Sequence, residues 1–334
     1  MSHLGIIVNP AAGRDIRRLT GGATVVDNHA KRRVAECVLA GLTVVSDPPE
    51  VTLMPDKSGI AASVVENAPE NVSVDLLDMS PTGRAADTRR AAERFQTHAD
   101  ALIVLGGDGT TRDVALGCDD LPLLSVSTGT NNVVPSAIDG TVAGAAAALV
   151  ATGAVDDEVV TYCHQMVEAR TESDRSVTGL AAVELSDRSF VGTRALLDPD
   201  ELLGGIVSRA SLSAIGLSGV AGAFGSLAPD EPGSIGLRLA DVETCDRTAR
   251  AIVAPGVATE FAVTDFQRIS DGSSMTVEVD DAVIGADGER ELEVTNETVE
   301  FYPVPDGPRL ISYEAVFDRA AGNEVLVSNS FENR

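Results

Sequence analysis

The chain has 334 residues, enough for two domains with sizeable cores, and 44% of its residues are hydrophobic. Asp and Glu number 51 against 25 Lys and Arg, which gives a formal net charge of −26. The carboxylates are dispersed, which argues against a disordered acidic tail, and so acidic a surface disfavours nucleic acid and anionic membranes as partners. Because salt screens self-repulsion, we expect a halophilic protein from a salty cytoplasm.

The first half of the chain, residues 1–153, alternates short apolar runs with helix-like stretches, as doubly wound α/β domains do. The expected strands are 4–8, 51–54, 74–77, 101–105 and 121–126, and the expected helices are 30–42, 87–99 and 142–151. The first strand follows the amino terminus without a basic region, which is unlike a signal peptide. No window approaches the about 18 apolar residues of a membrane span, so we expect a cytoplasmic protein.

Residues 154–305 are richer in Thr, Val and acidic residues, and this pattern predicts a β-sandwich domain. The expected strands include 236–239, 259–263, 275–279 and 291–294. Residues 204–225 crowd glycine with small apolar side chains, which is compatible with a mobile substrate flap or a packed interface. We favour packing, because glycine content alone does not indicate motion. A strand at 310–313 and a helix at 314–321 predict that residues 306–334 return to the first domain.

The most informative segment is the buried strand 101–105 followed by Gly106-Gly107-Asp108-Gly109-Thr110. Glycines in such a loop allow a polyanion to approach the backbone, and the next helix offers N–H groups and a positive dipole end. A carboxylate there would repel phosphate if the loop only bound it. We therefore expect Asp108 to orient a hydroxyl, to take its proton or to hold a metal ion.

Two more loops follow strands of the same predicted sheet, whose carboxyl ends form the usual ligand edge. One runs from Asn9 to Gly13, and the other is Thr128-Gly129-Thr130-Asn131-Asn132. Each alone is usually only a turn, but three together predict a nucleotide site. The sequence has neither a Walker motif nor Gly-x-Gly-x-x-Gly after the first strand, and we expect no lysine near these loops. Phosphate binding is therefore expected to depend on the backbone and a metal ion.

Other candidate residues have competing interpretations. Asp287-Gly288 is a hairpin signal, whereas the sharper hypothesis places Asp287 or Glu289 in a cleft between the domains. Arg112 either reaches phosphate or pairs with a carboxylate such as Asp113. Zinc and redox motifs have no support, because the four cysteines form no CxxC pair and the four histidines no spaced ligand set.

In their order, Asn9-Pro10 with Gly13, the 106–110 and 128–132 loops and Asp287-Gly288-Glu289 resemble the motifs of the NAD kinase and diacylglycerol kinase superfamily. Residues 127–135, 141–144 and 287–290 are similar to the ATP-NAD kinase branch that includes acetoin catabolism protein X. The resemblance implies an α/β domain, a β-sandwich domain and an active site in the cleft between them.

The resemblance further implies that Asp108 is a general base or metal organiser for phosphoryl transfer to the 2′-hydroxyl of NAD, giving NADP. The donor would be ATP with Mg²⁺, or polyphosphate, and the three loops would bind these small-molecule nucleotides. A homo-oligomer is also implied. Acceptor and donor stay open, because the 128–132 loop is closer to the lipid kinase Gly-Thr-x-Asn-Asp and the Asn-Glu pair of NAD kinases has no counterpart. A diacylglycerol-type lipid kinase and a non-catalytic nucleotide sensor are the alternatives.

Overall fold

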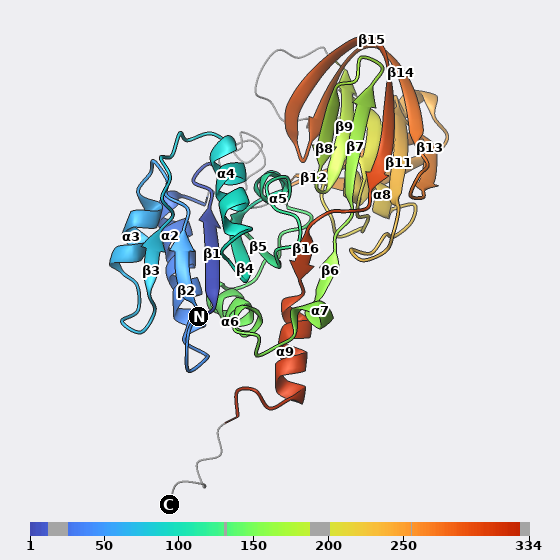
Figure 1. Cartoon of the computed structure of the whole chain (residues 1–334). Helices are drawn as coiled ribbons and strands as arrows, with labels where there is room; N and C mark the ends of the chain where they lie inside the picture. The colour runs from blue at the N-terminus through green and yellow to red at the C-terminus, as the bar shows by residue number, and fades with distance from the viewer. Residues whose placement is uncertain (13–25, 130–131, 188–200, 255, 328–334) are drawn as a thin grey trace, which may run out of the picture.

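A computed structural model describes residues 1–12, 26–129, 132–187, 201–254 and 256–327, which form an α/β part and an antiparallel β part (Figure 1). The predicted fold class, α/β plus all-β, is confirmed. None of the helices within these ranges is both long and apolar enough to cross a bilayer.

The first sheet has seven strands in the order β3-β2-β1-β4-β5-β16-β6, parallel except for the edge strand β6. The strands are β1 (His3–Val8), β2 (Glu50–Leu53), β3 (Val74–Leu76), β4 (Ala101–Gly106), β5 (Leu123–Ser127), β6 (Thr161–Cys163) and β16 (Arg309–Ile311). The helices are α2 (Asn28–Leu42), α3 (Ile60–Glu66), α4 (Ala86–Phe95), α5 (Asp108–Ala115), α6 (Gly140–Ala151), α7 (Asp157–Val160) and α9 (Tyr313–Gly322).

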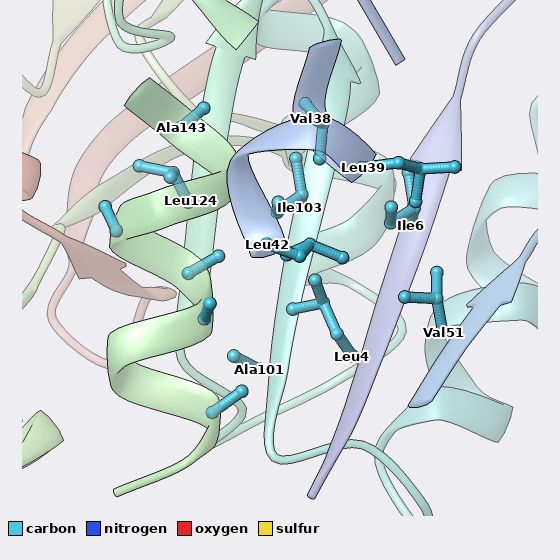
Figure 2. Close-up of a cluster of buried hydrophobic side chains, with 14 of the residues drawn as sticks. Leu4, Ile6, Val38, Leu39, Leu42, Val51, Ala101, Ile103, Leu124 and Ala143 are labelled. Atoms are coloured by element: carbon cyan, nitrogen blue, oxygen red, sulfur yellow. The ribbon is translucent and has the colours of Figure 1, made fainter. Parts of the chain in front are cut away.

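Helices cover both faces of this sheet, and its central strands are buried throughout. In β4, Ala101 and Ile103 face the helical layer of α2, α6 and α9, whereas Leu102 and Val104 face that of α4 and α5. Figure 2 shows the first layer, where Leu39 of α2 and other labelled side chains meet strands β1, β4 and β5. Because both faces are covered, these strands are continuous apolar runs.

The second sheet is antiparallel and has nine strands in the order β12-β13-β11-β10-β9-β14-β15-β7-β8. Val167 of β7 and Ile206 of β10 share one core although three strands lie between theirs in the sheet order, so the sheet folds over itself as a sandwich does. The strands are β7 (Met166–Thr171), β8 (Ser176–Gly179), β9 (Ala182–Asp187), β10 (Leu202–Val207), β11 (Ser234–Ala240), β12 (Thr248–Ala254), β13 (Val257–Ile269), β14 (Met275–Ala286) and β15 (Glu289–Val304).

Strands β14 and β15 are much longer than the sequence pattern predicts, since charged residues interrupt their apolar alternation. They form one long hairpin, and Asp287 and Gly288 make its turn with φ of 52° and 83°. Two positive φ values are the signature of a type I′ turn, for which Asp-Gly is a preferred sequence. The long pairing therefore brings this turn to the end of the sheet that meets the first domain (Figure 1).

The glycine-rich segment packs against its own domain. Its glycines at 204 and 205 lie in β10, and its last third contains helix α8 (Leu217–Gly222). Leu217, Val220 and Ala221 are buried in a core with strands β10 and β11.

After the second sheet the chain returns to the first, where β16 pairs with β5 and β6. Ser312 then caps α9 by accepting a hydrogen bond from the Ala315 N–H at 3.3 Å.

Candidate functional site

Asp108 is the first residue of helix α5, directly after the carboxyl end of β4. The N-cap residue is Gly107, which has no side chain to accept a hydrogen bond from the first turn. Free N–H groups at a helix N-terminus attract anions, and the dipole adds to that attraction. The loop therefore combines an anion-binding backbone with a carboxylate.

The three loops lie together at the carboxyl edge of the first sheet. Asn9 donates from its side-chain amide to the Thr110 hydroxyl at 2.8 Å, which joins the first loop to the second. The Thr128 N–H donates to the Gly106 carbonyl at 3.0 Å, which joins the third loop to the second. Neighbouring strands β1, β4 and β5 place these loops side by side, so segments about a hundred residues apart form one surface.

The Asp108 carboxylate is buried, with 6% of the residue exposed, and faces the third loop. Its two oxygens accept the N–H groups of Val133 and Val134, both at 2.9 Å. Burial and the nearby charge of Asp287 raise the pKa of Asp108 to about 7, against the opposing effect of those two N–H groups. A group that ionises near neutrality is suited to accept a proton from a substrate.

Two loop glycines are required by contacts within the protein. A Cβ atom on Gly106 would lie 2.5 Å from Cβ of Thr110, and one on Gly107 would lie 2.7 Å from Oδ1 of Asn132. Gly109 is different, because a Cβ there would meet only the Glu289 carboxylate, at 3.7 Å. The glycines at 106 and 107 thus let the loops approach one another, whereas space remains beside Gly109.

The third loop is held by Ser127, the last residue of β5. Its hydroxyl donates to the Gly129 carbonyl at 2.8 Å and accepts from the Asn132 amide at 2.7 Å. The Thr128 hydroxyl is buried and has no hydrogen-bond partner among the described residues. The predicted nucleotide-binding residues Gly13, Thr130 and Asn131 lie outside the described residues.

The hairpin turn brings Asp287 to the boundary between the two domains. Its carboxylate is fully buried and accepts the N–H groups of Leu180, Ala181 and Ala182 at 2.9, 2.8 and 3.2 Å. Burial raises its pKa, although Arg112 and these N–H groups oppose that effect. Asp287-Gly288 is therefore both a hairpin turn and part of the boundary between the domains, since the turn itself places the Asp287 carboxylate at that boundary.

Arg112 spans the boundary and pairs with carboxylates of the second domain. Its guanidinium lies 2.7 Å from Glu291 and 3.8 Å from both Asp287 and Glu289, and it donates to the Ala286 carbonyl at 3.2 Å. Only 5% of the Arg112 side chain is exposed. Asp113, the carboxylate named from the sequence, instead pairs with Arg89 at 2.8 Å.

The expectation that no lysine lies near the loops is wrong. Lys31 of α2 is fully buried, and its ammonium donates to the Pro10 carbonyl of the first loop at 2.6 Å. The residues are 21 positions apart, and packing of α2 beside β1 brings them together. Arg209, which follows β10, is a second basic residue that sequence reasoning missed, and it donates to the Val133 carbonyl at 3.1 Å. Neither contact has a local sequence signal.

Histidine and cysteine form no metal centre in the described part of the chain, where no group of three or more potential metal-ligating side chains occurs. His164 is buried, and its Nε2 lies 3.2 Å from the Leu180 carbonyl and 3.3 Å from the Ser208 hydroxyl. Burial lowers the pKa of His164 to about 4. This histidine therefore supports the segment that holds Asp287 and is neutral at pH 7.

Comparisons with known proteins match both halves of the chain. Residues 4–154 match the family model of the ATP-NAD kinase N-terminal domain, and residues 165–306 match that of the acetoin catabolism protein X C-terminal domain. Acetoin catabolism protein X of Cupriavidus necator is 33% identical over 301 residues, which cover 86% of this chain and 84% of that protein. A solved diacylglycerol kinase structure from Bacillus anthracis str. Sterne has a TM-score of 0.43 and 14% identity, covering 94% of this chain and 98% of that one.

Proposed function

Because the chain belongs to the ATP-NAD kinase family, in the branch of acetoin catabolism protein X, we propose that it transfers a phosphoryl group to the 2′-hydroxyl of NAD. ATP is the proposed donor and polyphosphate its substitute. The observation that carries the proposal is the joining of three loops around one buried carboxylate, Asp108, beside the uncapped first turn of α5.

In the proposed reaction, Asp108 accepts the proton of the acceptor hydroxyl. Each carboxylate oxygen of Asp108 already accepts one N–H group and keeps a further lone pair for this proton. The hydroxyl oxygen forms a bond to the γ-phosphorus, the bond from that phosphorus to its bridging oxygen breaks, and ADP leaves with the electron pair. Such a transfer needs mainly alignment and charge neutralisation, which fixed loops provide.

Magnesium would fit this site as an ion that is already bound to the phosphates of the nucleotide. Mg²⁺ bound to phosphates commonly uses only one or two protein carboxylates. Glu289 meets that need, since 69% of its side chain is exposed and its carboxylate lies beside Gly109. The ion would neutralise charge on the transferring phosphoryl group.

The test uses the full chain in concentrated KCl with NAD, Mg²⁺ and either ATP or polyphosphate, and an NADP-specific dehydrogenase measures the product. Asp108→Asn is expected to lower kcat by about 10²-fold or more, the scale of a lost general base. Asp87→Asn is the matched control, because Asp87 is also buried and accepts two backbone N–H groups, those of Thr82 and Gly83.

Retention of full activity by Asp108→Asn would rule out its proposed role. Absence of NADP with both donors would rule out NAD as acceptor. Diacylglycerol in mixed micelles is then the next acceptor to assay, because the 128–132 loop resembles that of lipid kinases. Calorimetric binding of ATP without turnover of any acceptor would support the nucleotide-sensor alternative.

A further inference from the structure

Arg209 is a basic residue of the second domain that lies close to the Asp108 site of the first domain. It follows β10 (Leu202–Val207) and reaches the residue directly after the third loop of the first domain, where Nη1 donates to the Val133 carbonyl at 3.1 Å. The N–H group of the same Val133 donates to Asp108. The guanidinium and the Asp108 carboxylate are thus bound to opposite polar groups of one residue.

The charge of Arg209 is not neutralised by a neighbouring ion pair. Within the described ranges its hydrogen-bond acceptor is the uncharged Val133 carbonyl, and no carboxylate lies within 4.0 Å of it, although its charge acts on Asp108 and lowers the pKa of that carboxyl. A guanidinium has five N–H donors, so most of them are available to another acceptor. Arg209 is half-buried, which strengthens its interaction with any anion that reaches it.

Arg112, the other arginine near Asp108, differs from Arg209 because its charge is already compensated by ion pairs. Its guanidinium is buried and faces Glu291, Asp287 and Glu289, so second-domain carboxylates already compensate its charge. A phosphate would have to displace those partners to reach it. Comparison of the two arginines therefore favours Arg209 as the side chain that contacts a phosphate.

We propose that Arg209 binds the phosphoryl group under transfer, as a cation that the second domain supplies to the loops of the first. The inference rests on the proposed function, which requires an anionic donor beside Asp108. A planar guanidinium suits phosphate oxygens because two N–H groups can donate in parallel. Contact across the domain boundary would also couple donor binding to the alignment of the two domains.

The variants are Arg209→Gln, which removes the charge and keeps a donor for the Val133 carbonyl, and Arg209→Lys, which keeps the charge but not the planar fork. Arg94→Gln is the control, because Arg94 also donates from Nη1 to a backbone carbonyl, that of Asp78. The first assay is calorimetric binding of inorganic tripolyphosphate, which needs no acceptor. The second is NAD phosphorylation, with kcat and the donor KM measured separately.

Arg209→Gln is expected to weaken tripolyphosphate binding at least tenfold and to lower kcat by about 10²-fold, the usual cost of one lost transition-state donor. Arg209→Lys should restore part of the binding, and if Arg209→Gln does not fold, the Lys variant alone should still lower kcat several-fold. Arg94→Gln should resemble the wild type in both assays.

The two proposals fail in different ways. If the wild type does not bind tripolyphosphate, or if both Arg209 variants bind it and turn over like the wild type, the inference about Arg209 is overturned. If tripolyphosphate binding depends on Arg209 but no NADP forms, the anion site stands and the proposed NAD kinase activity fails.

Discussion

Replacement of Arg112 by Met should destabilise the protein by about 4 kcal/mol. At an effective dielectric constant of about 20, two unit charges separated by the 3.8 Å between Arg112 and Asp287 attract by about 4 kcal/mol. Removal of one partner from a buried ion pair costs a similar amount, about 3–5 kcal/mol, because the other charge stays buried. Met preserves most of the apolar volume, so a cavity contributes little.

Thermal unfolding at pH 7.5 in concentrated KCl measures this effect. A loss of 4 kcal/mol corresponds to a decrease in Tm of roughly 6 °C for a chain of this size. Arg309→Met is the control, since Arg309 lies 2.8 Å from Asp157 but both side chains are partly exposed, at 26% and 37%. Exposed pairs contribute at most about 1 kcal/mol.

A second variant identifies the cause. Asp287→Asn removes the buried negative charge that Arg112→Met leaves without its partner, and Asn tolerates the positive φ of this turn. The double variant Arg112→Met/Asp287→Asn should therefore be more stable than Arg112→Met alone. Loss of Arg112 also raises the pKa of Asp287 further, so the deficit of Arg112→Met should shrink as the pH falls. Equal effects of Arg112→Met and Arg309→Met, or no rescue in the double variant, would refute this reasoning.

Two further predictions concern pH and packing. Because Asp108 must be ionised to accept a proton and its pKa is raised to about 7, kcat should be low at pH 6, rise through pH 7 and level off above it; a pH–rate profile flat from 5.5 to 8.5 would contradict this role. Gly144→Ala should lower stability by at least about 1–3 kcal/mol, since the added Cβ would lie 2.0 Å from the Val38 carbonyl oxygen between α6 and α2. Gly322→Ala, whose Cβ would meet no atom within 4 Å at the end of α9, should be neutral or slightly stabilising in the same denaturation assay.

Local sequence determined the buried strands of the first sheet, the hairpin turn and the position of the loops. The apolar run at 101–105 predicts a buried strand because helices cover both faces of the sheet, and the glycines after it mark the change to a loop. The Asp-Gly pair at 287 and 288 predicts the hairpin turn that forms, because these two residues adopt positive φ with little strain. Signals of this kind involve residues within one turn or strand, so they can be read without the fold.

Tertiary structure alone decided which charged groups meet. The Glu291 and Ala286 partners of Arg112 are 179 and 174 residues away, and no local pattern selects them over phosphate or Asp113. The carboxylate of Asp108 likewise becomes a near-neutral titrating group only because the fold buries it and places it near Asp287, against the two N–H groups of Val133 and Val134 that lower its pKa. Coulomb interactions and desolvation depend on distance in space and on burial, and packing of the two domains sets both.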